Sequence, residues 1–334
     1  MTRLFFGLWL TAYAAQGSIL MTSTVGVGGF DASIRIGGGS GTIFAIVDNG
    51  GNVETLCIVT ADHVLSTTAP TTIGIRGSGN GGFDVTAVSS VQRRGGPTGK
   101  EDLAFVGFTI DLNKINNIDE VDTLASITPE TLGSAPASTP FDIQAYGYGA
   151  TARPTTNFEK IDYMGAIYVH PLNDPAYAYG TERTYTNTIK QFGNYNQKGY
   201  QYNDMSYSFN DSGDGLGLGG DSGSGLIANG NVVGVYTRAQ SQYFDDAAMP
   251  CQLESGNCTA EAIYKGAVGS GLAFTGSDVE WLNQKGLPEP STWVLLLTGL
   301  AAMPLAVRLR PRPHPIQTRP LTASDDPRLP PSRS

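Results

Sequence analysis

A serine flanked by glycines in the second half of the chain has the setting of a nucleophile. Ser222 lies in the run Gly220-Asp221-Ser222-Gly223-Ser224, directly before an apolar segment typical of a strand. A tight turn there would leave the hydroxyl exposed and let the N–H groups of Gly220 and Ser222 point into one concavity. Two such donors stabilise the oxyanion of a tetrahedral intermediate. The run therefore predicts acyl transfer, with Gly220 and Ser222 as the oxyanion hole and Asp221 holding the turn by pairing with a buried cation.

A serine hydroxyl is a poor nucleophile until a base takes its proton, and the chain has 3 histidines. His314 follows the last apolar stretch, and His170 precedes a proline, which favours a loop. His63 ends the apolar run that begins at Cys57, where a buried strand emerges into a turn. We therefore expect His63 to be the general base, held in a cleft by a rigid support.

The base needs a carboxylate that fixes its tautomer and stabilises the imidazolium. Asp102 comes just before the apolar run from Leu103 to Val106, where burial is costly unless the acid is hydrogen-bonded. Asp62 is the competitor, but it adjoins His63, and adjacent strand residues point to opposite faces. Asp102 is therefore the predicted orienting residue.

The elements that must position these residues are strands. Charged residues make up 15% of the 334 residues, and there are 43 glycines, a profile of an all-β protein with many turns. The net charge of -9 disfavours nucleic-acid binding. Apolar alternation of strand type predicts twelve strands, at 34–36, 42–47, 55–60, 72–75, 83–91, 103–108, 141–148, 161–169, 184–192, 225–227, 231–238 and 267–274.

These strands fall into two sets of about six, which predicts two small β-barrels. Residues 30–130 would form the first barrel, with the histidine and the aspartate, and residues 137–275 the second, with the serine; the Pro-rich stretch 128–140 connects them. Ser277 as N-cap and Glu280 as its partner predict one terminal helix over 276–286. The Tyr- and Asn-rich tract 177–210 is explained by strands and loops of the second barrel, with a sugar- or peptide-stacking surface as the alternative.

The cysteines and acidic residues offer no clear metal site, and no cofactor is expected. Cys251 and Cys258 bracket a short loop and would close a disulfide in an oxidising compartment. Cys57 is predicted to be a buried, unpaired thiol. The oxygen-rich run 210–215 resembles a calcium loop but has no flanking helices and no terminal glutamate, so a plain turn is favoured.

Both ends of the chain have the character of processing signals. Residues 1–15 carry a basic residue, an apolar run and a small-x-small cleavage pattern, which predicts a signal peptide, with a short buried strand as the alternative. Residues 287–312 resemble the PEP-CTERM sorting signal of Gram-negative envelopes, with a Pro-Glu-Pro box, a short apolar span and a basic stop. The resemblance implies a transient anchor, handled by signal peptidase and an exosortase-type protease, and a secreted or surface-associated protein. Residues 313–334, beyond the stop, are expected to be a disordered tail.

The three blocks around His63, Asp102 and Ser222 resemble the signatures of chymotrypsin-like (trypsin-family) serine proteases, in that family's chain order. The resemblance implies a serine endopeptidase acting through an acyl-enzyme on protein or peptide substrates. It also implies a specificity pocket, in which Leu216 stands where trypsin has an aspartate, so cleavage after Arg or Lys is not expected and a small or apolar residue is preferred. The residues expected to form this pocket are Leu216, Thr237, Arg238, Ala239 and Gly271.

Two other functions compete with an active endopeptidase. A catalytically silent homologue would serve as an envelope binding or adhesion module, but it has no reason to keep all three catalytic residue types. An esterase with the same chemistry would need the order Ser, Asp, His and alternating helices. The chain order and the strand pattern favour the protease.

Overall fold

The computed structural model describes residues 18–20, 23–24, 32–66, 68–76, 82–95, 100–152, 158–163, 166–171, 182–210, 214–217, 220–240 and 267–286. The segments predicted to be a signal peptide, a sorting anchor and a tail, and the predicted disulfide of Cys251 and Cys258, lie outside these ranges. Met1–Pro288 forms one compact unit, and the second unit, Glu289–Ser334, is not described. Within the described ranges, none of the helices has the length and apolar character to cross a membrane.

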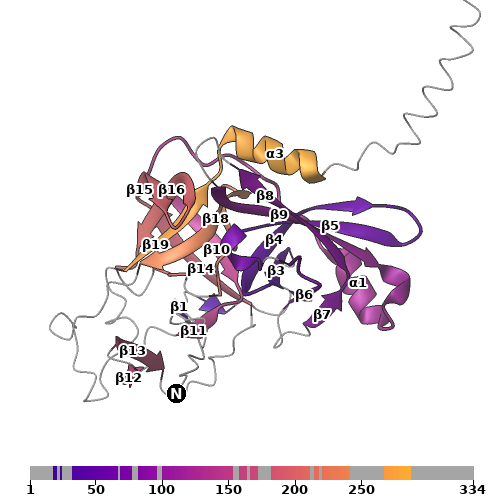
Figure 1. Cartoon of the computed structure of the whole chain (residues 1–334), viewed down its shortest axis with the longest axis horizontal. Helices are drawn as coiled ribbons and strands as arrows, with labels where there is room; N and C mark the ends of the chain where they lie inside the picture. Colours follow the sequence, from indigo (N-terminus) through magenta and orange to yellow (C-terminus); the bar gives the residue numbers. More distant parts are fainter. Residues whose placement is uncertain are drawn as a thin grey trace, which may run out of the picture. The chain divides into compact units, whose positions relative to one another are not determined.

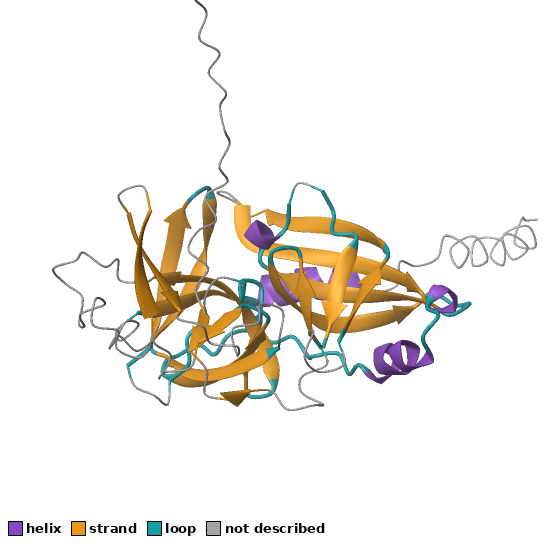
Figure 2. Ribbon diagram, turned by 90° about the horizontal axis from the view of Figure 1, so that it is seen from below, coloured by secondary structure: helices purple, strands orange, loops and turns teal. Residues whose placement is uncertain are grey.

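Strands dominate the described chain (Figure 2), so the expected all-β class is confirmed. The first group of strands precedes residue 112 and is antiparallel throughout. Its members are β3 (Ser33–Ile36), β4 (Gly39–Asp48), β5 (Val53–Thr60), β6 (Thr72–Ile75), β7 (Phe83–Thr86), β8 (Val88–Gly95) and β9 (Lys100–Asp111).

The second group of strands follows residue 140 and supplies the serine loop. Its members are β10 (Phe141–Gly147), β14 (Arg183–Ile189), β15 (Gln191–Gln197), β16 (Tyr200–Ser208), β17 (Gly225–Ala228), β18 (Asn231–Gln240) and β19 (Val268–Ala273). Four short strands form two separate two-stranded sheets: β1 (Ser18–Leu20) pairs with β11 (Ala150–Ala152), and β12 (Phe158–Tyr163) pairs with β13 (Ala166–Pro171). The last short strand, β2 (Ser23–Thr24), pairs with β14.

Hydrogen bonds join both groups into one 15-stranded sheet. Its order is β2-β14-β10-β17-β18-β19-β16-β9-β5-β4-β3-β6-β7, with β15 added beside β16 and β8 beside β9. The groups meet where Tyr200 of β16 pairs in parallel with Lys100 of β9. The order has two ends, at β2 and β7, so the sheet is not closed.

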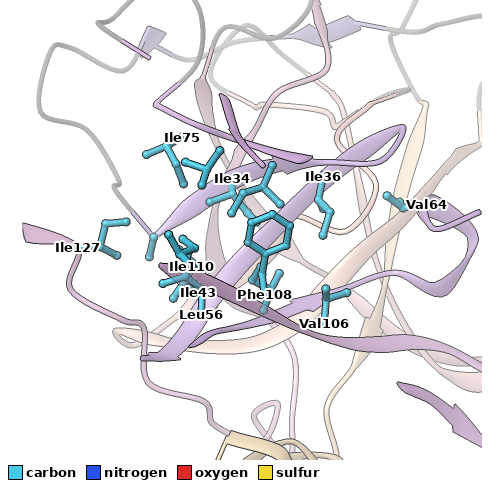
Figure 3. Close-up of a cluster of buried hydrophobic side chains, with 14 of the residues drawn as sticks. Ile34, Ile36, Ile43, Leu56, Val64, Ile75, Val106, Phe108, Ile110 and Ile127 are labelled. Carbon is cyan, nitrogen blue, oxygen red and sulfur yellow. The ribbon is translucent and has the colours of Figure 1, made fainter. Parts of the chain in front are cut away.

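Each group of strands encloses its own apolar core because every second side chain faces inward. In the first group, isoleucines, valines and leucines from several strands surround Phe108, which is completely buried (Figure 3). In the second group, the core is richer in aromatic residues, including the buried Tyr185, Tyr207 and Tyr236. A third buried cluster takes residues from both groups, such as Val59 and Val235, and holds the groups together.

Three strand predictions need correction in their extent. The segment 83–91 is two strands, β7 and β8, separated by Ala87, and the segment 184–192 is β14 followed by β15. The segment 161–169 is the hairpin β12–β13, so His170 lies in a strand and not in a loop. The alternation of apolar residues continues across such breaks, and only the pairing of the neighbouring strands reveals them.

A helix that the sequence analysis did not predict follows the first group of strands. The short 3₁₀ helix η2 (Leu112–Lys114) leads into α1 (Ile118–Ser126), and the Asn117 side chain accepts a hydrogen bond from the Asp119 N–H. The helix buries Leu124 against the first core. The expectation of a single helix is therefore wrong, although Asn117 and the apolar spacing after it are ordinary helix signals.

The terminal helix α3 (Gly276–Gly286) occupies the expected range, but its cap differs from the prediction. Thr275 and not Ser277 caps the helix: its hydroxyl accepts the Asp278 N–H at 3.4 Å, and the Asp278 carboxylate accepts the Thr275 N–H at 2.8 Å. This is a reciprocal capping box that uses an aspartate at the third position. The prediction was wrong because Thr275, like Ser277, is followed three residues later by an acid, and the helix begins directly after Thr275.

The helix α3 lies against strands of the first group (Figure 1), and a largely buried cluster of charged side chains joins the two. Arg94 Nε lies 3.4 Å from Asp278 Oδ1 and 3.6 Å from Glu101 Oε2, and its guanidinium lies over the Trp281 ring. Burial, followed by the Asp278 carboxylate, raises the pKa of Glu101 to about 7, against the opposing effect of Arg94. One cation thus faces two carboxylates, and protonation of Glu101 relieves their repulsion.

This cluster predicts a loss of stability as the pH rises. Because the pKa of Glu101 is raised from 4.5 to about 7, the folded chain keeps a proton in this pH range that the unfolded chain has lost. The contribution of Glu101 to the free energy of unfolding therefore declines between pH 4.5 and pH 7 and stays low at higher pH. Glu101→Gln mimics the protonated acid, so we expect it to raise the melting temperature by about 2–4 °C at pH 8 and hardly at all at pH 4.5. Glu280→Gln, an exposed carboxylate on the same helix, is the control. Equal effects of the two variants at pH 8 would contradict the prediction.

Candidate active site

A short turn at the end of a buried strand places His63 at the surface. The residues of β5 from Leu56 to Thr60 are buried between β4 and β9. The 3₁₀ helix η1 (Asp62–Val64) follows, and Val64 returns to the core while the His63 side chain is 36% exposed. The strand thus provides a rigid support, and the turn places one imidazole at the surface.

Asp102 holds His63 through both of its carboxylate oxygens. Asp102 Oδ2 lies 2.7 Å from His63 Nδ1, and Oδ1 accepts the backbone N–H of His63 at 3.0 Å. The carboxylate is 6% exposed, so it contacts little water. Hydrogen bonding to the acid assigns the proton to Nδ1 and leaves Nε2 free to accept another proton. The contact predicted between these two side chains is present, and Asp62 does not make it.

The serine loop is a tight turn that requires glycine on both sides. Gly220 has φ +92° and Gly223 has φ +88°, a backbone region that residues with a Cβ rarely adopt. The Ser224 N–H donates to the Asp221 carbonyl at 2.9 Å, which closes the turn around Ser222. Ser222 is partly exposed. The turn therefore presents the hydroxyl-bearing residue at its tip.

The first group of strands contacts the serine loop through β4. The Ser40 N–H donates to the Ser222 carbonyl at 2.8 Å, and the Ser40 hydroxyl donates to the Gly220 carbonyl at 2.9 Å. A Cβ on Gly39 would lie 2.5 Å from the Ser222 carbonyl oxygen and 2.8 Å from Val64 Cγ2. Ser222 and the residue after His63 thus lie on either side of the same glycine.

A second contact joins the serine loop to the end of β5. A Cβ on Gly223 would collide with the Ser40 carbonyl oxygen and with Thr60 Oγ1, and would lie 3.1 Å from the Ala61 N. Residues 60 and 61 directly precede the turn that carries His63. The fold therefore seats the loop of Ser222 against the segments that position His63. The structure brings the two residues into the same region, but among the described residues the Ser222 hydroxyl makes no hydrogen bond with the His63 imidazole, whose ring contact is with Asp102.

Two backbone N–H groups in the serine loop remain available to a ligand. The N–H of Gly223 donates to the Tyr236 carbonyl at 2.7 Å, and that of Ser224 is used within the turn. The N–H groups of Gly220 and Ser222 donate to no acceptor in the parts of the chain that the structure describes. These are the two donors predicted for the oxyanion hole, a role that requires N–H groups without another acceptor.

Asp221 anchors the same loop from inside the protein. Its side chain is completely buried, and Oδ1 accepts the Gly149 N–H at 2.8 Å. A Cβ on Gly147 or Gly149 would collide with the carboxylate, so glycine is needed at both positions. The Gly149 N–H is one partner of this carboxylate, and the buried cation that the sequence predicts for Asp221 stays a prediction.

Two of the residues predicted to form the specificity pocket lie in the interior. Leu216 is completely buried and belongs to the core of the second strand group. Gly271 pairs with Tyr236, and a Cβ there would lie 2.5 Å from Leu226 Cδ1. The Tyr236 hydroxyl donates to the Gly217 carbonyl. Core side chains, among them that of Tyr236, thus fill the space next to residues 216 and 217.

The other three predicted pocket residues lie along β18. The Thr237 hydroxyl accepts a hydrogen bond from the Tyr202 hydroxyl at 3.0 Å, and Ala239 is partly buried against the core. Arg238 lies 2.9 Å from Asp204 and 3.9 Å from the centre of the Tyr195 ring. Burial raises the pKa of Asp204 to about 6, although Arg238 opposes the shift. Arg238 is therefore engaged by a carboxylate and an aromatic ring on β16 and β15.

Three residues near His63 were not assigned a role by the sequence analysis. Asp62 is buried, and its carboxylate contacts Arg93 on β8 and Tyr200 on β16. Asp62 was recognisable as an acid beside a candidate base, but no sequence signal pointed to Arg93 or Tyr200 as its partners. The contact depends on β8 and β16, which are both neighbours of β9 in the sheet.

The cysteine that the structure describes is not part of the site. Cys57 is buried and free, as predicted, and burial raises the pKa of its thiol to about 11. A protonated thiol in the interior is a poor nucleophile. Among the described residues, no group of three or more metal-ligating side chains comes together.

No protein-family model matches this sequence, and no curated protein is significantly similar to it. The assignment of a function therefore depends on the arrangement of His63, Asp102 and the Ser222 loop, and on the chemistry of those groups.

Proposed function

We propose that the chain is a secreted serine endopeptidase of the chymotrypsin-like class, which hydrolyses peptide bonds with Ser222, His63 and Asp102. The observation that carries the proposal is a convergence of distant segments. The buried Asp102 carboxylate lies 2.7 Å from His63 Nδ1, and the Ser222 loop packs against the residues that flank His63. A purely structural histidine would have no need of this neighbouring serine loop.

The proposed reaction uses each group in turn. His63 Nε2 accepts the proton of Ser222 Oγ as the hydroxyl attacks the scissile carbonyl, and Asp102 stabilises the resulting imidazolium. The free N–H groups of Gly220 and Ser222 stabilise the oxyanion. His63 then protonates the leaving amine, which departs and leaves an acyl-enzyme. Water hydrolyses this ester by the same steps, and the serine is regenerated.

The chymotrypsin-like architecture of two six-stranded barrels is also part of the proposal. In the first group, β6 pairs with β7 and β8 pairs with β9, and only Ala87 separates β7 from β8. If β7 and β8 count as one bent strand, the six strands of this group form a ring. Separate apolar cores in the two groups support two barrels as well.

The proposed substrates are proteins or peptides without a basic residue at the cleavage site. A trypsin-like pocket needs a carboxylate to pair with lysine or arginine, and Leu216 at the corresponding position is apolar and buried. Tyr236 adds bulk beside the same segment. Both features favour a small or apolar residue before the scissile bond.

Export belongs to the proposal on sequence grounds alone. The segments 1–15 and 287–312 would direct the chain to signal peptidase and to an exosortase-type sorting protease of a Gram-negative envelope. The membrane would be contacted only through the transient C-terminal anchor. Neither segment lies within the described residues.

Labelling with a fluorophosphonate tests the proposed nucleophile without knowledge of the natural substrate. We expect the wild-type protein to be labelled at Ser222, as mapped by mass spectrometry, and Ser222→Ala to show no labelling. His63→Ala should react at least about 10³ times more slowly, because the hydroxyl loses its base. Ser126→Ala, which removes an exposed serine of α1, is the control and should be labelled like the wild type. Equal labelling of wild type and Ser222→Ala would reject the site, and labelling of neither would favour a silent binding module.

A further inference from the structure

A second buried carboxylate, that of Asp62, directly precedes the candidate base along the chain. The Asp62 side chain is 4% exposed, although the residue occupies a turn at the surface. A carboxylate at this depth is unfavourable unless charged or polar partners compensate for the lost water. Asp62 has two such partners, and each comes from a different strand.

The first partner of Asp62 is a cation on β8. Arg93 Nε lies 2.5 Å from Asp62 Oδ1, and Arg93 Nη2 donates to the Ser66 carbonyl at 2.8 Å. One guanidinium therefore holds the turn at both ends, because Asp62 begins η1 and Ser66 follows it. These contacts restrain η1 in addition to the two hydrogen bonds that Asp102 makes with His63.

The second partner of Asp62 comes from the other group of strands. The Tyr200 hydroxyl donates to Asp62 Oδ2 at 3.2 Å, and Tyr200 lies at the junction of β16 with β9. Burial, followed by the negative charges of Asp62 and Asp102, raises the pKa of Tyr200, so the phenol stays protonated and remains a donor. This hydrogen bond ties the turn of His63 to the strand group that carries Ser222.

We propose that Asp62, Arg93 and Tyr200 form a positioning unit that sets both the location and the electrostatic environment of His63. This inference rests on the proposed function in assigning His63 the role of base. None of the three residues touches the reacting atoms in this scheme. They act by fixing η1, so that the imidazole meets the Ser222 loop in one position.

The charges around His63 make the electrostatic part of the proposal testable. The groups that face its turn are Asp102 from β9, Asp62 from η1, Arg93 from β8, and Tyr200 with Tyr202 from β16. The negative charge of Asp62 and the positive charge of Arg93 compensate each other. Removing one charge of the pair leaves the other uncompensated next to the imidazole, with opposite signs for the two single variants.

The test is a double-mutant cycle with Asp62→Asn and Arg93→Gln. Asp62→Asn leaves a bare cation, so we expect the midpoint of the acidic limb of kcat/KM to fall by about 0.5 pH unit; Arg93→Gln should raise it by a similar amount. The double variant should return to within about 0.2 pH unit of the wild type. In Asp62→Asn we expect kcat to fall about ten- to a hundredfold with KM within about threefold, because a displaced base affects chemistry more than binding.

Two further variants separate positioning from charge and from folding. Arg93→Lys keeps the charge but loses the two-ended contact, so the midpoint should stay constant while kcat falls. Arg35→Gln is the matched control, because Arg35 forms an ion pair with Asp84 at 2.6 Å on a more exposed surface. It should change neither quantity. Melting temperatures of all variants show whether each chain is folded at the assay temperature.

The midpoint can also be followed without catalysis, by NMR titration of the His63 imidazole among the 3 histidines of the chain. Opposite shifts of this titration in the two single variants would support the unit even if fluorophosphonate labelling had already rejected the protease. Shifts of the same sign, or none, in folded variants would overturn the electrostatic claim. An unchanged kcat in active Asp62→Asn would overturn the positioning claim.

Discussion

Replacing Asp102 by asparagine is expected to lower kcat by about 10⁴-fold, the loss that the same substitution causes in established Ser-His-Asp triads. The structure supplies the reason. Both oxygens of Asp102 are bound to His63, one at Nδ1 and one at the backbone N–H. An amide N–H in this place would donate to Nδ1, where the carboxylate accepts a hydrogen bond from it. The imidazole would then carry its proton on Nε2, and Nε2 could no longer act as a base. A 10⁴-fold loss corresponds to about 5.5 kcal/mol of transition-state stabilisation.

The measurement needs a substrate that reports on chemistry, such as a fluorogenic peptide chosen from a library, together with the rate of fluorophosphonate labelling. Asp111→Asn is the matched control, since it makes the same change at the far end of β9, where the partly exposed Asp111 pairs with Lys114. We expect Asp111→Asn to retain at least half of the wild-type rate. If the two variants were equally active, Asp102 would have no part in the reaction.

Replacing Gly223 by alanine is expected to destabilise the fold by at least about 3 kcal/mol. The residue has φ +88°, which costs a residue with a Cβ roughly 1–2 kcal/mol. The new methyl group would also collide with the Ser40 carbonyl oxygen and with Thr60 Oγ1, which are themselves hydrogen-bonded to each other at 2.7 Å. Neither can move without disturbing β4 or β5. The same collision would push the Ser222 loop away from His63, so labelling should also be lost.

Gly230→Ala separates the collision from the backbone cost. Gly230 has φ +76° in the turn between β17 and β18, and a Cβ there would meet no atom within 4 Å. We expect a loss of only about 1 kcal/mol for this variant. Urea unfolding followed by circular dichroism compares the two. Failure of Gly223→Ala to fold while Gly230→Ala folds agrees with the prediction, whereas equal stabilities would show that the serine loop does not pack against β4 and β5 as described.

The contact between His63 and Asp102 was predictable because each residue adjoins a buried strand. Leu103 to Val106 and Cys57 to Ala61 are continuous apolar runs, and two such runs favour neighbouring strands in one core. The preference for Asp102 over Asp62 is confirmed by the contact, but its stated reason is not, because residues 62 and 63 lie in η1 and not in a strand. The role of glycine at 220 and 223 was evident from local geometry, because a sharp turn needs residues without a Cβ.

Other features could not be read from local patterns. The breaks at Ala87 and Lys190 interrupt no apolar alternation, so the strands on either side were predicted as one. The helix α1 was overlooked although its cap is visible, because one short amphipathic helix of 9 residues is a weak signal beside twelve strand signals. The place of Leu216 in the specificity pocket stays a prediction from resemblance, and its complete burial in one cluster with tyrosines from three strands could not be read from its sequence neighbours.

The sequence by itself determined the all-β class, the residue types able to carry acyl transfer, and the glycines that a serine turn requires. These are local properties, set by periodicity and by the conformational limits of single residues. Only the tertiary structure decided which partners the buried charges find: Arg93 and Tyr200 for Asp62, Arg94 for Glu101, and Asp204 for Arg238. Such pairings join strands that are distant along the chain, and their energies depend on burial, which no local pattern encodes.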